Sequence, residues 1–200
     1  MHQDNVTAVF QPTALGWKTV LLAMVVSLLA APALAFEADS LLGNARLLYY
    51  ESVKDKNKIS AAIEMFDLIG RSDLSLQGRA QTYIGSLVAV KAKFAFWPHD
   101  KWKLAKRGLR LMDDGLAQNP DDIESLFIHG VTCYYLPKFF GRKDDAQRHL
   151  RAIVRLLPEN ARNYDQKIIA NVIKFIVEKI KLDDEERRKL VEINTRLALK

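Results

Sequence analysis

The sequence predicts an all-α fold of about eight helices. Apolar side chains recur at three- and four-residue spacings through most of residues 37–197, which is the spacing of one helix face. Almost no segment has the residue pattern of a strand. Gly, Pro and Asp interrupt the helical pattern at short intervals, and eight helices with short breaks between them make four antiparallel hairpins.

The first two hairpins are expected between residues 37 and 118. The first helix covers about residues 37–53 and ends at a polar turn. The second helix places four apolar side chains on one face, namely Ala62, Ile63, Phe66 and Ile69. Two further helices, at about 74–94 and 101–118, are separated by the break at 97–100.

The last two hairpins begin at a well-marked joint. Pro120 ends the preceding hairpin, and Asp121 or Asp122 caps the helix that follows. The sixth helix is expected to end at Pro158, and Asp183 caps the eighth. The other expected helix ranges are about 122–135, 144–157 and 161–181.

The N-terminus predicts the compartment. Residues 19–36 are almost wholly apolar, and small residues at Ala33 and Ala35 fit a signal-peptidase site, so residues 1–35 are expected to be a secretory signal cleaved after Ala35. The alternative is an uncleaved anchor in the inner membrane, because about 18 apolar residues make a short bilayer span. In both cases residues 36–200 form one domain outside the cytoplasm, which predicts a periplasmic or exported protein.

The net charge and the cysteine content indicate how the protein interacts and what holds its core together. The formal net charge is +6, and it stays at +6 without residues 1–35, which favours solubility and affinity for acidic surfaces. Cys133 is the only cysteine, so no disulfide forms within the chain. The core must therefore be held together by helix packing.

Small and bulky residues recur at fixed spacings on the second helix of several hairpins. Two complete sets, each closed by a proline, are Gly108, Met112, Gly115 and Pro120, and Ala146, Leu150, Ile153 and Pro158. Ala62, Phe66 and Ile69 follow the same spacing, and Leu126 with Gly130 fits the matching first helix. Over most of residues 40–160 this pattern resembles the tetratricopeptide repeat (TPR). The resemblance implies a short right-handed solenoid that binds a partner.

The repeat is irregular. Pro120 and Pro158 are 38 residues apart, where the tetratricopeptide repeat has about 34, and the surplus falls in the turn 136–141. A second surplus falls near residues 94–98. The turn 137–142 also resembles turns in exported helical-repeat proteins such as the T component associated with some TRAP transporters.

One pair of residues could carry chemistry. His129 and Cys133 are four residues apart and share a helix face, so they could form a nucleophile pair or half of a metal site. A core-facing cysteine beside a hydrogen-bonded histidine is the favoured interpretation, because His99 and His149 show no ligand spacing with the pair. Asp113 is expected on a solvated face. The sequence predicts no catalytic residue, no cofactor and no metal site.

Basic and aromatic side chains are interleaved between residues 91 and 155. They define a candidate surface for a partner or ligand: Lys91, Phe94, Phe96, Trp97, Lys101, Trp102, Phe139, Phe140, Arg148, Arg151 and Arg155. No nucleic acid is expected, because an exported protein rarely meets single strands. Three interpretations stay open: aromatics that fill a gap between hairpins, contact with a membrane surface, and a surface for an acidic protein or lipid.

Three classes of function follow. The first is an adaptor or scaffold that binds a protein or peptide of the cell envelope along the helical stack. The second is a carrier or small-ligand binder of a transport or envelope-assembly system, favoured by the aromatics of both long turns. The third, a hydrolase or redox protein using Cys133 and His129, ranks last, and the protein is expected not to be an enzyme.

Overall fold

The structure is a computed structural model that describes residues 40–198. Residues 1–41 and 42–200 form two separate units, so the second is described by itself. The expected signal or anchor lies outside the described residues. No helix of the described part has the length and apolar character needed to cross a bilayer.

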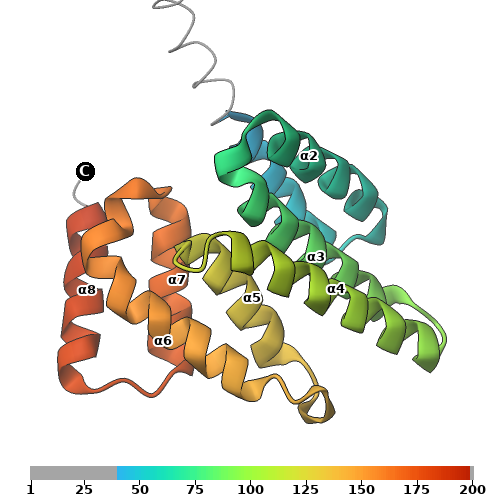
Figure 1. Cartoon of the computed structure of the whole chain (residues 1–200). Helices are drawn as coiled ribbons and strands as arrows, with labels where there is room; N and C mark the ends of the chain where they lie inside the picture. Colours follow the sequence, from blue (N-terminus) through green and yellow to red (C-terminus); the bar gives the residue numbers. More distant parts are fainter. Residues whose placement is uncertain (1–39, 199–200) are drawn as a thin grey trace, which may run out of the picture. The chain divides into compact units, whose positions relative to one another are not determined.

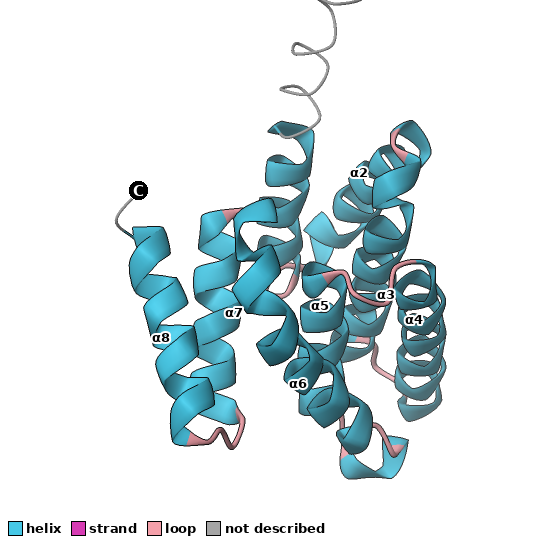
Figure 2. Cartoon of the chain, turned by 60° about the vertical axis from the view of Figure 1, so that its left-hand side comes forward, coloured by secondary structure: helices cyan, strands magenta, loops and turns pink. Residues whose placement is uncertain are grey.

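Every regular element of the described chain is helical, and Figure 2 shows no strand in it. Residues 40–52 are helical and precede seven further α-helices. These are α2 (Ile59–Ser72), α3 (Gln77–Phe94), α4 (Pro98–Gln118), α5 (Ile123–Tyr135), α6 (Lys143–Asn160), α7 (Gln166–Lys179) and α8 (Asp184–Ala198). Four 3-10 turns lie between them: η1 (Lys56–Lys58), η2 (Leu74–Leu76), η3 (Lys138–Phe140) and η4 (Ala161–Asn163). The predicted all-α class is confirmed.

Consecutive helices pack in pairs, α3 on α4, α5 on α6 and α7 on α8. The α3–α4 pair is the tightest, because Gly85 and Gly108 face each other across it. A Cβ added at Gly108 would lie only 2.5 Å from the Gly85 carbonyl oxygen. Gly130 of α5 similarly receives Leu150 of α6, 3.1 Å from where a Cβ would stand. These small residues therefore lie at helix crossings, as the sequence pattern requires.

The pairs are joined to one another through α5 and α6. Helix α5 packs on both α3 and α4, and α6 packs on α8 (Figure 1). Apolar side chains fill these junctions. Phe66 of α2 stacks on Tyr83 of α3 at 4.3 Å, and Tyr49 meets Tyr83 edge-on. Buried apolar side chains are thus contributed by every helix from residues 42–52 to α8.

Capping residues explain most helix starts. The side chain of Asp122 accepts a hydrogen bond from Ser125 N at the start of α5, and Asp183 accepts one from Glu186 N at the start of α8. Both caps confirm the sequence prediction. Asp165 caps α7 in the same way, where no cap was expected.

Three predicted boundaries were wrong. Helix α4 begins at Pro98, not near 101, because proline suits the first helical position, where its missing N–H costs nothing. Helix α6 continues past Pro158 to Asn160, since the Asn160 side chain donates to Leu156 O and keeps the last turn paired. Residues 161–163 form η4, so α7 starts at Gln166.

Candidate functional site

An open groove lies along residues 49–50, α5 and α7. We call it the Tyr50 groove, with a volume of about 390 Å³. Its lining residues are Tyr49, Tyr50, Phe127, Ile128, Val131, Asn171, Lys174, Phe175 and Glu178. Tyr50 is 40% exposed, whereas Phe127 is almost buried. The groove thus combines an apolar floor with polar side chains of α7.

Phe175 is the centre of the aromatic wall of this groove. Its ring meets Phe127 at 5.7 Å, Tyr134 at 5.6 Å and Tyr135 at 6.2 Å, each in an edge-on arrangement. Edge-on aromatic pairs stabilise the wall beyond their buried area. Asn171, Lys174 and Glu178 follow along α7 at three- and four-residue spacings, so they form one polar border. The candidate surface chosen from the sequence did not include any of these residues.

A second cavity lies between the α3–α4 turn and the α5–α6 turn. We call it the Trp102 pocket, with a volume of about 580 Å³. It contains four of the predicted residues, Lys101, Trp102, Phe139 and Phe140. The Trp102 ring stacks at 4.7 Å on Phe140 and at 5.8 Å on Phe139. Trp102 of α4 thus meets the aromatics of the α5–α6 turn, whereas Phe96 and Trp97 of the α3–α4 turn do not line the pocket.

The remaining aromatics of the candidate surface lie apart from this pocket. Lys91 and Phe94 line a different cavity, of about 470 Å³, against α2 and η1. Phe96 and Trp97 pack edge-on against each other at 5.0 Å and are 83% and 58% exposed. They do not fill a gap between hairpins, so that interpretation is wrong for these two residues.

The three arginines of α6 do not act as one free basic stripe. Arg151 pairs with Glu186 of α8 at 2.6 Å and also donates to Lys181 O. Arg148 pairs with Asp145 on its own helix, while Arg155 is exposed. Arg151 thus joins α6 to the last hairpin.

His129 and Cys133 lie in a polar cluster between α4, α5 and α6. We call the set Asp113, His129, Cys133, Arg142 and His149 the His129 cluster. His129 Nε2 lies 2.8 Å from Asp113 Oδ1, and His129 Nδ1 lies 3.4 Å from Cys133 Sγ and 3.1 Å from His149 Nδ1. Arg142 also donates to Asp113, whose side chain is 43% exposed, so Asp113 lies on a solvated face as the sequence predicts and also bonds the cluster.

The tautomer of His129 follows from these contacts. A carboxylate only accepts hydrogen bonds, so the 2.8 Å contact with Asp113 assigns the proton to His129 Nε2 and makes His129 Nδ1 the acceptor. The longer 3.3 Å approach of Arg142 Nη2 to the same Nε2 is then not a hydrogen bond. Burial lowers the pKa of His129, partly offset by Asp113. Burial and the neighbouring His129 lower the pKa of His149 to about 4. Both imidazoles are therefore neutral at pH 7.

Burial also decides the chemistry of Cys133. Its side chain is 1% exposed, and burial raises the pKa of the thiol to about 11. A nucleophilic cysteine needs a thiolate and access to a substrate, and this thiol has neither. No group of three or more His, Cys, Asp and Glu side chains in residues 40–198 is arranged to hold a metal ion.

A buried ionic network at the start of α5 was not predicted from the sequence. We call it the Glu124 cluster: Arg46, Arg79, Tyr83, Asp122, Glu124 and Tyr164. Arg46 Nη2 lies 2.5 Å from Glu124 Oε2, and Arg79 Nη2 lies 2.5 Å from Asp122 Oδ1. Tyr83 donates to the fully buried Glu124.

The pKa values of this cluster are shifted in the directions that favour the charged pairs. Burial alone would raise the pKa of Asp122, but hydrogen bonds from Arg79 and Ser125 lower it below the ordinary value. Burial and the adjacent Glu124 raise the pKa of Tyr83 well above its ordinary value. The only signal in the sequence was Glu124 itself, an acidic residue beside a helix cap, which predicts a first-turn charge and not a buried one.

Comparison with known proteins adds no relative: no protein-family model, no curated protein and no solved structure matches the chain.

Proposed function

We propose that the protein is a TPR-like helical-repeat adaptor that holds an extended segment of a partner protein in the Tyr50 groove. The observation that carries the proposal is the makeup of this groove, which three non-consecutive helical segments build together: residues 49–50, α5 and α7. Stacked helical repeats create extended surfaces that bind partners. The exported location expected from the N-terminus places the partner in the cell envelope.

The chemistry of the groove suits a peptide. The aromatic wall around Phe175 offers stacking to apolar side chains, and Asn171 on α7 offers an amide that both donates and accepts. Lys174 and Glu178 supply one charge of each sign on the same border. This mixture of aromatic anchors and a polar rim is typical of protein-binding surfaces.

The test starts from a peptide selection. Random linear peptides are selected on the full chain, and their affinities are measured for the wild type, Phe175→Ala and Lys174→Glu. Loss of an aromatic anchor typically weakens binding by about tenfold or more. The charge-matched control is Arg110→Glu, on the exposed face of α4. Selected peptides that bind all four proteins equally would contradict the proposal.

A second experiment addresses the compartment. The protein is purified from its own cells and its mature N-terminus is sequenced. A chain that starts at Phe36 supports export with cleavage after Ala35. A chain that retains residues 19–36 in the membrane fraction supports the anchored alternative. A full-length chain in the cytoplasmic fraction contradicts both.

The Trp102 pocket favours a second candidate function, that of a carrier for a small apolar ligand. Apolar side chains from two turns line it, with Lys93 and Lys101 beside them. Native mass spectrometry of the freshly purified full chain should then show a bound small molecule. Ala92→Trp, which fills the pocket, should abolish this added mass, whereas Leu74→Trp on the exposed η2 turn should keep it.

A further inference from the structure

We propose that the edge formed by the α3–α4 and α5–α6 turns docks on the surface of an anionic phospholipid bilayer. We call this surface the turn edge. Its members are Phe96, Trp97, Lys101, Trp102, Lys103, Tyr135, Lys138 and Phe139. The proposal goes beyond the adaptor function, because none of these residues lines the Tyr50 groove, and only Tyr135 contacts its wall, through Phe175.

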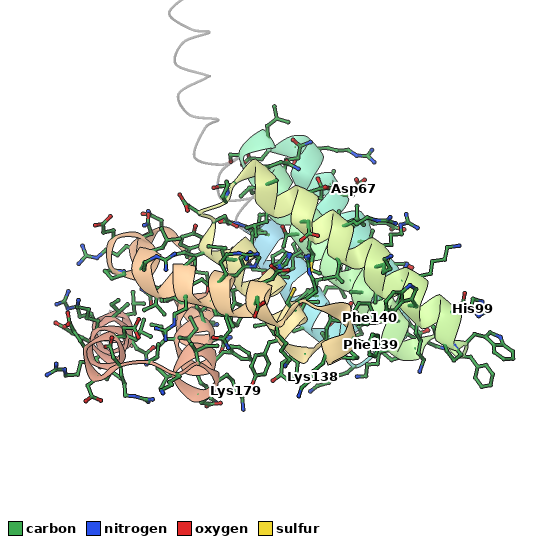
Figure 3. The ribbon with its side chains drawn as sticks, turned by 60° about the horizontal axis from the view of Figure 1, so that its bottom comes forward. Asp67, His99, Lys138, Phe139, Phe140 and Lys179 are labelled. Carbon is green, nitrogen blue, oxygen red and sulfur yellow. The ribbon has the colours of Figure 1, made fainter. Side chains whose placement is uncertain are left out.

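The two turns form one continuous surface. Trp102, four residues into α4, stacks on both Phe139 and Phe140 of the other turn. Phe96 and Trp97 continue the surface on the α3–α4 turn itself. Figure 3 shows Lys138, Phe139 and Phe140 along this edge with His99 at its end, while Asp67 lies on the other side of the view.

Exposed aromatics are concentrated here. Six aromatic side chains of the described residues are classed as exposed, and all except Tyr50 lie on the turn edge. Phe96 is 83% exposed, Phe139 70% and Tyr135 67%. Single exposed apolar residues are normal on protein surfaces, but exposed aromatics gathered at two adjacent turns mark a binding surface. Trp and Tyr in particular prefer the boundary between lipid headgroups and acyl chains.

The charge of the turn edge matches an anionic surface. Residues 93–103 carry three lysines and one acid, and residues 135–143 carry Lys138, Arg142 and Lys143 without any acid. The connections at the opposite ends of the helices, residues 72–76, 119–122 and 158–165, carry five acidic residues and one arginine. This asymmetry would orient the molecule with the turn edge toward the lipid.

A bilayer explains more of this surface than a soluble ligand does. A small molecule in the Trp102 pocket would cover Trp102 and Phe139, but Phe96 and Trp97 are not part of that pocket. A bilayer can cover both sets at once, with lysines at headgroup level around the inserted rings. The ligand is therefore the lipid surface and not one bound lipid.

The first experiment measures whether a single tryptophan enters the lipid bilayer. The chain has three tryptophans, so Trp17→Phe with Trp102→Phe leaves Trp97 as the only one. Vesicles with about one-third anionic lipid, brominated on their acyl chains, should quench Trp97 fluorescence. In a matched chain whose only tryptophan is Leu74→Trp, on η2, the same vesicles should leave fluorescence unchanged. Both chains keep residues 1–39, so any lipid binding by that segment affects them equally.

The second experiment measures the charge contribution. Lys101→Glu with Lys138→Glu should weaken vesicle binding of the full chain, by about fivefold or more for each lysine. The control Arg162→Glu with Lys167→Glu makes the same change in net charge near the opposite edge, and both residues are exposed. It should change vesicle affinity far less than the turn-edge pair. All four positions are exposed, and an unchanged thermal transition verifies folding.

Two results would overturn the proposal. One is unquenched Trp97 on vesicles that bind the chain, which would mean that another surface contacts the lipid. The other is equal weakening by the two charge pairs, which would mean that lipid attraction depends only on net charge. If a soluble protein, and not vesicles, protects Trp97 from an aqueous quencher, the turn edge is a protein interface instead.

Discussion

Helix α5 contributes to two polar clusters, and the buried polar groups of the two are stabilised in different ways. One cluster uses ion pairs and the other uses neutral side chains. The Glu124 cluster at its start uses paired charges from separate helical segments, since Arg46 and Arg79 both reach the same acidic turn. The His129 cluster in its middle uses neutral imidazoles whose pKa values are lowered by burial. Glu124 and His129 are both fully buried, so burial alone does not decide whether a group stays charged.

The two clusters differ because their polar groups have different hydrogen-bond and ion-pair partners. Glu124 receives a guanidinium and a tyrosine hydroxyl, and Asp122 receives Arg79, Ser125 and Tyr164, so each carboxylate is well satisfied. In the His129 cluster, Arg142 Nε lies 2.9 Å from Asp145 but makes no hydrogen bond of good geometry. The Glu124 cluster should therefore stabilise the fold and favour this one packing of the helices. The His129 cluster should make the free energy of unfolding depend on pH.

The largest expected effect is the removal of one charge from the Glu124 cluster. Glu124→Gln leaves Arg46, whose side chain is only 14% exposed, beside a neutral partner, which should lower the free energy of unfolding by about 3 kcal/mol. Urea denaturation followed by circular dichroism measures this loss. The matched control is Glu64→Gln, exposed on α2, which should change stability by less than about 0.5 kcal/mol.

A double replacement sharpens this prediction. Arg46→Met with Glu124→Leu removes both charges, so it should be less destabilising than Glu124→Gln alone. A double variant that loses more than the single one would show that the pair itself, and not the unpaired arginine, determines the stability.

The second-largest expected effect is that the stability of the folded chain depends on pH through the His129 cluster. The pKa of His149 is lowered to about 4 in the folded chain, whereas an unfolded histidine has a pKa near 6.5. Below pH 6.5 the unfolded chain thus binds more protons, and stability falls as the pH falls toward 4. Because His149 is only half-buried, solvent screening reduces the effect, and His149 contributes on the order of 1 kcal/mol between pH 7 and pH 5; His129 acts in the same direction.

The matched variant is His149→Gln, which removes the titrating group and keeps a polar side chain. Its stability should change less between pH 7 and pH 5 than that of the wild type. Asp122 has a lowered pKa, so its contribution is lost only at more acidic pH and does not enter this window. An unchanged pH slope in His149→Gln would assign the effect to other groups.

Local features were predictable from the sequence, and the two clusters were not. The caps at Asp122 and Asp183 follow from residue type and position, and Gly108 and Gly130 follow from spacing, since only a small residue permits a close crossing. Those signals act over a few residues. They therefore define helices and crossings well.

The clusters depend on how the helix pairs stack. Arg46 and Glu124 are 78 residues apart, and nothing in either neighbourhood marks them as partners. His149 lies 20 residues after His129, so no ligand-like spacing joins them in the sequence. The Trp102 pocket was partly predictable, because both aromatic turns were recognised as insertions. The Tyr50 groove was missed because its aromatics lie on helices and resemble ordinary core residues.

The smallest expected effect concerns Cys133, and it separates a buried thiol from a catalytic one. Burial raises the pKa of the thiol to about 11, so it stays protonated at pH 8 and can donate to His129 Nδ1. A disulfide reagent should modify Cys133 within seconds in urea, but in the native chain only as fast as the protein opens. Cys133→Ser should keep the peptide affinity of the wild type, because Cys133 does not line the Tyr50 groove. Rapid labelling of the native chain at neutral pH would instead show an accessible thiolate. That result would support the hypothesis that Cys133 acts as a nucleophile with His129.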